Sequence, residues 1–211
     1  MVKDISRIYP MYHGLKSPRP IDAFTGNKNP RVYDLELTPD WHQVTLFNSG
    51  KERTTIAVKL HTPMVDGGLA LDSTALYYVY DFWKDAFVGK LKGNATLSTE
   101  LNSMACVMYA VRKVQTIPQL LSTNRHILQG WMELKDMQWN NSKKTLAGKA
   151  AVVAGEPFKI VIAANNWKLV QVKSNASSIK WENHPQNNDL KILVIENNST
   201  QNIEWSVSFK K

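Results

Sequence analysis

The chain has 211 residues, of which 43% are hydrophobic and 21% charged, proportions typical of a folded globular protein and not of a disordered one. That length allows one ordinary domain or two small ones, but it is too short for a (β/α)₈ barrel of about 250 residues with further structure attached. The 26 basic and 18 acidic residues give a formal net charge of +8, but the basic residues are scattered and form no nucleic-acid-binding motif.

The first expected element is a short helix at 2–9, where apolar residues have helical spacing and Pro10 ends the pattern. After it, segments rich in Val, Ile, Thr and aromatics are separated by Gly, Pro, Asn and Asp, which is typical of short β-strands. The strands expected in the first half are 31–37, 42–48, 54–59, 76–82, 87–92, 95–101 and 105–113. Those expected in the second half are 130–138, 145–153, 158–164, 168–173, 177–182, 190–196 and 203–209.

The spacing of these strands predicts an all-β protein made of two tandem antiparallel β-sandwich units, the second of them immunoglobulin-like. We expect an N-terminal extension at 1–30, a first sandwich at 31–115, a junction around Pro118 at 116–129, and a second sandwich at 130–211. Alternation is clearest in the last strand, where Ile203, Trp205, Val207 and Phe209 share one face.

Motifs for enzymatic chemistry are missing from the sequence. The nucleophile elbow, the P-loop, the dinucleotide fingerprint and the H-E-x-x-H zinc motif are absent, and the five histidines occur singly. The single cysteine, Cys106, lies in an apolar run and is expected to be a small buried residue. We therefore expect no cofactor, no metal and no catalytic residue, and neither nucleic acid nor a membrane as partner.

Aromatic residues beside turns are weak candidates for carbohydrate contacts. Asp81 and Asp85 flank Phe82 and Trp83 in a segment that predicts a hairpin with Asp85 at its turn; a sugar-contacting Trp83 is the alternative. Trp139, Trp167 and Trp181 also adjoin turns, although buried tryptophans that pack a core are common in sandwiches.

Four stretches, taken together, resemble a known family. They are RIYPMYHGLKSPRPIDAF…NPRVYDLEL (7–37), WHQVTLFN (41–48), LYYVYDFWKDAFVGKLKG (76–93) and PQLLSTNRHILQG (118–130). They resemble the region that follows the catalytic barrel in bacterial melibiase-like glycoside hydrolases, relatives of α-galactosidase and α-N-acetylgalactosaminidase. The strings DFW-x-D-x-F-x-G-x-L and STNRH-x-x-QG are the most specific part of this resemblance, which fades after about Phe158.

The resemblance implies a β region that packs against the barrel and supports it. The catalytic aspartates of the family lie on barrel strands, so no catalytic residue can be carried over to this chain. Residues 2–9 would be the end of the last barrel helix, and the apolar residues at 5–12 would meet the barrel or mediate self-association. The family analogy suggests a periplasmic or extracellular location, although the N-terminus has no signal-peptide pattern.

Three functions remain open at this point. The favoured one is a non-catalytic accessory region that supports a missing catalytic barrel. The second is a carbohydrate-binding module that uses exposed tryptophans. The third is a self-sufficient glycosidase with two carboxylates on a sheet face.

Overall fold

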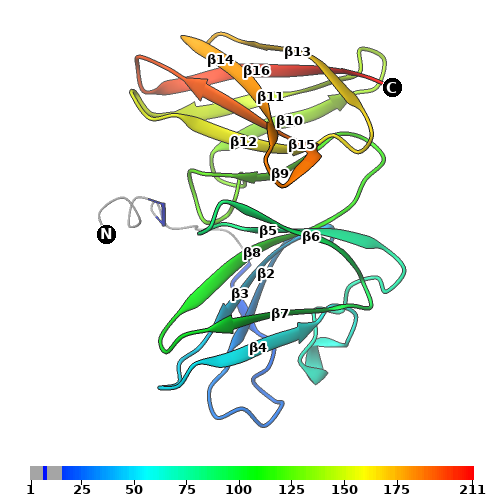
Figure 1. Cartoon of the computed structure of the whole chain (residues 1–211), viewed down its shortest axis with the longest axis vertical. Coiled ribbons are helices and arrows are strands. Elements are labelled where there is room, and N and C mark those ends of the chain that lie inside the picture. The colour runs from blue at the N-terminus through cyan, green and yellow to red at the C-terminus, as the bar shows by residue number, and fades with distance from the viewer. Residues whose placement is uncertain (1–6, 9–15) are drawn as a thin grey trace. The chain divides into compact units, whose positions relative to one another are not determined.

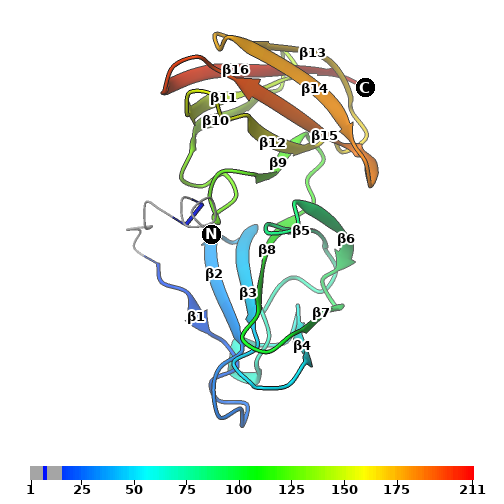
Figure 2. The same cartoon turned by 60° about the vertical axis from the view of Figure 1, so that its left-hand side comes forward.

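A computed structural model describes residues 7–8 and 16–211 of the chain. These form two compact units: the described residues from Lys16 to Val114 make the first, and Gln115–Lys211 together with Arg7 and Ile8 make the second (Figures 1 and 2). The predicted helix at 2–9 and the predicted contact segment at 5–12 lie outside the described residues, apart from Arg7 and Ile8, which form a turn.

The first unit contains a six-stranded and a two-stranded antiparallel sheet. The six-stranded sheet has the order β1-β2-β3-β8-β5-β6 and the small sheet pairs β4 with β7. The strands are β1 (Arg19–Pro20), β2 (Val32–Thr38), β3 (Trp41–Phe47), β4 (Thr54–Lys59), β5 (Leu76–Asp81), β6 (Ala86–Lys92), β7 (Thr96–Leu101) and β8 (Cys106–Lys113). A single turn of 3-10 helix, η1 (Met64–Asp66), is the only helical element among the described residues.

The core of the first unit lies between these two sheets. Ile56 and Val58 of β4 are buried while their neighbours Thr55 and Ala57 are exposed, which matches the period-2 pattern of a strand with one face in the core. On the large sheet, the core face carries Val44, Val79 and Val111 among others.

The second face of the large sheet in the first unit is buried as well. Leu35, Trp41, Tyr78 and Tyr80 lie on the face opposite Val44 and Val79, together with the polar residue Arg112, and all five are buried. The central strands of this sheet are therefore buried on both faces.

The second unit consists of two four-stranded antiparallel sheets, with the orders β10-β11-β16-β13 and β14-β15-β12-β9. The strands are β9 (Gln119–Thr123), β10 (Leu134–Asn140), β11 (Thr145–Val152), β12 (Phe158–Ala163), β13 (Lys168–Ser174), β14 (Ser178–His184), β15 (Asn187–Glu196) and β16 (Gln201–Lys210). Its buried residues include Ile160, Leu193 and the four alternating apolar residues of β16.

The all-β prediction is confirmed, and every strand expected from the sequence is present with ends shifted by a few residues. Two strands were not expected. β1 lies inside the segment predicted as an N-terminal extension, and β9 lies inside the predicted junction. All five residues of β9 are buried, so this strand lacks the alternation by which half-exposed strands are recognised.

Core burial predicts a large difference between two substitutions in the second unit. Ile160→Ala removes a side chain with 0% exposure and should lower the free energy of unfolding by about 3 kcal/mol, through lost apolar burial and the cavity left behind. Val170→Ala, at a residue 54% exposed on β13, should cost about 0.5 kcal/mol or less. Urea denaturation checks the pair, and equal losses would contradict the assigned core.

Candidate functional site

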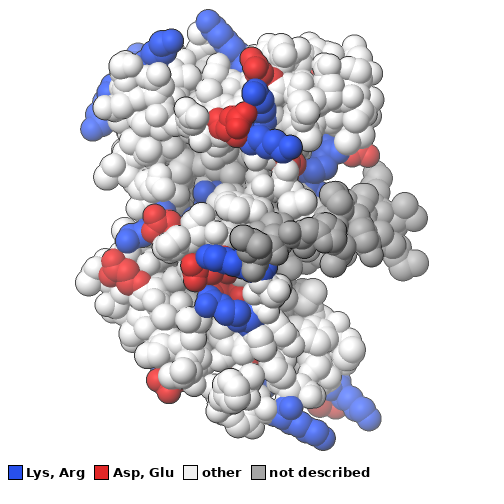
Figure 3. All heavy atoms as spheres, turned by 180° about the vertical axis from the view of Figure 1, so that it is seen from behind, with Lys and Arg blue, Asp and Glu red and all other residues white. Residues whose placement is uncertain are grey.

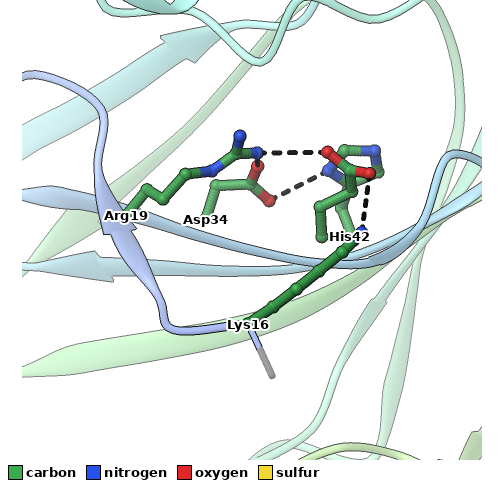
Figure 4. A network of polar contacts seen from close by, with 5 residues as sticks. Lys16, Arg19, Asp34 and His42 are labelled. Carbon is green, nitrogen blue, oxygen red and sulfur yellow. Dashed lines mark hydrogen bonds and ion pairs between the residues drawn. The ribbon is translucent and has the colours of Figure 1, made fainter. Parts of the chain in front are cut away.

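A network of charged side chains joins the first three strands of the first unit (Figure 4). Arg19 on β1 donates from Nη2 to Oδ2 of Asp34 at 2.9 Å and to Oε2 of Glu36 at 3.3 Å. Nδ1 of His42 on β3 lies 3.0 Å from the other carboxylate oxygen of Asp34. Lys16 donates to Glu36 at 3.0 Å, and this hydrogen bond holds the pKa of the Glu36 carboxyl below its usual value.

The Asp34–His42 pair has the geometry that orients a catalytic histidine in hydrolases. Both side chains are buried, with exposures of 0% and 5%. However, no serine, threonine or cysteine side chain among the described residues hydrogen-bonds to His42, so a nucleophile for this pair is not found there. What the network does in this structure is to hold β1 and β3 to β2.

Loss of the central carboxylate should therefore destabilise the first unit. Asp34→Ala leaves His42 and Arg19 without their buried acceptor, and we expect a loss of about 3 kcal/mol. Glu100→Ala is the matched control, because Glu100 pairs with Arg53 at 2.7 Å on the surface and such pairs contribute about 0–1 kcal/mol. Hydrogen exchange of the β2 and β3 amides measures both, and similar effects of the two variants would contradict a central role for Asp34.

A second polar cluster is formed by the string STNRH-x-x-QG, residues 122–130, in the second unit. Ser122 donates to Gln129 at 2.8 Å, and Thr123 donates to the carboxylate of Glu133. Asn124 accepts from the backbone of Lys159 at 2.9 Å. The segment thus connects β9 to the loop after it and to β12.

The same segment also holds the N-terminal turn. The backbone N–H of Ile127 donates to the carbonyl of Arg7 at 2.9 Å, and Nε2 of His126 lies 3.1 Å from the carbonyl of Ile8. Arg7 in turn donates to the carbonyl of Asn124 at 3.1 Å. These bonds join residues more than 110 positions apart in the chain.

Glu133 is the buried acid of this cluster. Desolvation raises the pKa of its carboxyl, although the hydrogen bond from Thr123 and the nearby His126 act in the opposite direction. Its second oxygen, Oε2, is buried with no hydrogen-bond partner among the described residues. The site therefore favours the protonated form of this side chain.

The raised pKa of Glu133 predicts in which direction the stability of the fold changes with pH. A group whose pKa is higher in the folded state stabilises the fold below its unfolded value of 4.5 and loses that contribution as pH rises through the folded value. Glu133→Gln cannot titrate, so the variant should be more stable than the wild type at neutral pH and close to it near pH 4. Urea denaturation across this range tests the claim.

The matched control for Glu133 is Glu156→Gln, since Glu156 is exposed and pairs with Arg125 at 3.2 Å on the surface. This control should show no gain in stability at neutral pH. A Glu133→Gln variant that is destabilised at neutral pH would mean that the buried carboxylate is ionised and paired.

The string DFW-x-D-x-F-x-G-x-L forms the hairpin of β5 and β6, as expected. Asp81 accepts from the backbone N–H of Lys84 at 3.1 Å, and Asp85, with φ +48°, lies at the turn and accepts from the hydroxyl of Tyr80 at 2.9 Å. Burial raises the pKa of Asp81. Both aspartates thus stabilise the hairpin, and half-buried Trp83 packs edge-on against Phe82, with ring centroids 5.0 Å apart.

Of the four tryptophans predicted as carbohydrate contacts, Trp83 belongs to the first unit and the other three belong to the second. Trp139 and Trp167 pack edge-to-face at 5.3 Å, and Trp139 also packs against Phe209 of β16. Trp167 is buried and donates to the carbonyl of Thr116, so these two rings help to form the sandwich. Trp181 on β14 is 39% exposed and is the one candidate of the four that counts as exposed, with Nζ of Lys191 5.8 Å from its ring centroid.

The expectation that Cys106 is buried is wrong. It is the first residue of β8 and is exposed, because strand alternation directs its neighbour Val107 into the core. Desolvation by the surrounding protein atoms raises the pKa of its thiol, which disfavours the thiolate.

The described residues contain no group of three or more His, Cys, Asp or Glu side chains placed to hold a metal ion. No helix in the described part of the chain is long and apolar enough to cross a membrane. On the face shown in Figure 3, basic and acidic side chains are interspersed and do not form a continuous basic surface.

Two hollows of about 420 Å³ each lie on the units, one beside β4 and one on the sheet of β11 and β16. Neither is lined by any of the four predicted tryptophans. No sequence pattern indicates the first hollow, because its lining residues come from segments that are adjacent only after folding.

Comparison with known proteins identifies no family for this chain. No protein-family model matches it, and no curated protein sequence does. Among solved structures, the isomalto-dextranase of Arthrobacter globiformis T6, determined with panose, is 11% identical with a TM-score of 0.35. The match covers 91% of this chain and 36% of that one, and a TM-score this low carries no conclusion about function.

Proposed function

We propose that this chain is a non-catalytic accessory region of a glycoside-hydrolase-like protein and that it supports an α-galactosidase-type catalytic barrel. The proposal rests on one observation about the two sequence strings by which the chain resembles melibiase-like enzymes: their polar side chains have structural roles. In both strings the polar side chains hold parts of the fold together: Asp81 and Asp85 in the hairpin, and Ser122, Asn124 and His126 around β9.

The buried carboxylates support the same conclusion. Asp22 accepts from the backbone of Arg31 and Val32, and Asp34 accepts from Arg19. Asp81 holds a turn and Glu133 accepts from Thr123. A glycosidase needs two carboxylates facing each other across about 5–10 Å, whereas these four each serve a different structural contact.

The glycines of the two strings also have structural roles. Gly89 has φ +154° and lies at the irregularity in the β5–β6 pairing. Gly130 has φ +113°, and a Cβ atom there would lie 2.5 Å from Cδ2 of Leu120. Both positions therefore require glycine to shape the fold.

The first test is hydrolysis of 4-nitrophenyl α-galactoside and α-N-acetylgalactosaminide by the purified chain. We expect no turnover above that of a mock preparation, because the buried acids Asp22, Asp34, Asp81 and Glu133 are each held in a structural contact. Turnover that is abolished by a single acid substitution, such as Asp81→Asn or Asp66→Asn, would overturn the proposal. If turnover survives both substitutions, a mechanism-based inhibitor would label the protein responsible. The label would then identify either a contaminating enzyme or another acidic residue of this chain.

The second test uses a melibiase-like catalytic barrel whose own β region has been deleted. Co-expression with this chain should raise the soluble yield and the melting temperature of the barrel, since its exposed apolar surface would be covered. An unrelated β-sandwich of similar size is the control. Equal yields with both partners would contradict a supporting role for that barrel class.

A further inference from the structure

The hollow beside β4 lies wholly within the first unit. Its lining residues come from the loop that follows β1, from β4, and from the segment around η1. These three elements lie at one end of the unit (Figures 1 and 2). Its volume of about 420 Å³ is in the range of small-molecule sites. Its polar lining includes Asn27, Arg31, Thr55, Lys59 and Asp66.

The floor of this hollow is fixed by a buried carboxylate. Asp22 is 5% exposed and accepts from the backbone N–H groups of Arg31 and Val32, each at 3.0 Å. Asn27 donates to Asp22 at 2.9 Å and accepts from Nη2 of Arg31 at 2.6 Å. Two lining side chains, Asn27 and Arg31, are thus held in place before any ligand arrives.

The opposite wall is also held in place. Gly67 follows η1 with φ +80°, and a Cβ atom there would lie 2.8 Å from Cγ2 of Thr25 in the facing loop. The turn is closed by hydrogen bonds from Gly67 to Met64 at 3.0 Å and from Ala70 to Thr62 at 2.9 Å. Because these hydrogen bonds and the close approach of Gly67 to Thr25 restrain both loops, a ligand would lose less free energy in ordering the site.

The charges of the lining indicate the class of ligand. Two cations, Arg31 and Lys59, are balanced by two carboxylates, Asp22 and Asp66, so the site does not select for an anion. Lys59 and Asp66 have no ion-pair partner among the described residues, and both are exposed. Together with Thr55 they offer donors and acceptors at once, which is what the hydroxyl groups of a neutral ligand require.

Two exposed apolar residues adjoin lining residues in the sequence. Phe24, which is 90% exposed, precedes the lining residue Thr25, and Val65, which is 75% exposed, precedes Asp66. The loop of Thr25 thus carries an exposed aromatic ring, and such a ring suits a ligand with apolar C–H faces and hydroxyl edges.

We infer that this hollow binds a neutral carbohydrate, one or two sugar units at the end of a glycan. The hydroxyls would bond to Asp66, Lys59, Arg31 and Asn27, and the ring face of the sugar would contact Phe24. None of the four predicted tryptophans lines this site. Because the site does not depend on a catalytic barrel, the inference goes beyond the proposed supporting function.

The test is an NMR titration of the ¹⁵N-labelled full chain with galactose, N-acetylgalactosamine, melibiose and isomaltose, each to about 50 mM, a range that detects millimolar affinity. We expect saturable shifts of the Thr25, Thr55 and Gly67 amides with at least one of these sugars. Asp66→Asn, Lys59→Met and Phe24→Ala should each weaken binding by about tenfold, as expected for loss of one good contact.

Matched controls are exposed residues that do not line the hollow: Asp40→Asn, Lys92→Met and Met104→Ala. They should leave the affinity unchanged, and the spectrum of each variant shows directly whether it is folded. Three outcomes would overturn the inference: no saturable shift with any of the sugars, tighter binding of glucuronate or inorganic phosphate than of neutral sugars, or shifts centred on Trp181. None of these outcomes bears on the hydrolysis and co-expression tests above.

Discussion

The burial of alternating apolar side chains between paired sheets is the interaction on which this protein depends. A chain with one cysteine cannot form an internal disulfide, so its stability has to come from packing and hydrogen bonding. In the first unit this packing involves Ile56 and Val58 opposite the valines of the large sheet; in the second it involves Ile160, Leu193 and the apolar face of β16. Polar side chains that are buried beside these cores must be hydrogen-bonded.

This need for hydrogen-bond partners accounts for the polar clusters described as candidate sites. Asp22, Asp34 and Glu133 lie at the edges of the cores, where the chain changes direction or where a short strand joins a sheet. Each is hydrogen-bonded, because a buried carboxylate without partners would be costly. The Asp34–His42 pair resembles part of a hydrolase site. In this fold, however, the hydrogen bonds of each cluster join one segment of the chain to another. Asp22 differs from the others because its attachment also shapes an open hollow.

The proposed roles fit together and rest largely on different residues, although Asp22 is part of the argument for both. The supporting function rests on the polar strings of the hairpin and of the 122–130 segment, whereas the carbohydrate site rests on the loops beside β4. An accessory region with a small sugar site of its own could keep a neighbouring catalytic domain close to its substrate, since linked sites raise the effective concentration.

The sequence by itself determined the all-β class and most strands, because period-2 alternation is a local property that a segment such as 203–209 displays without reference to the rest of the chain. It also placed Asp85 at a turn. It could not reveal β9, which is buried along its whole length, or β1, a two-residue strand defined by its pairing with β2. Only the tertiary structure decided which tryptophans are accessible and which polar residues line a hollow. Thr25, Lys59 and Asp66 become neighbours through loop packing, and contacts between distant segments leave no periodic trace in the sequence.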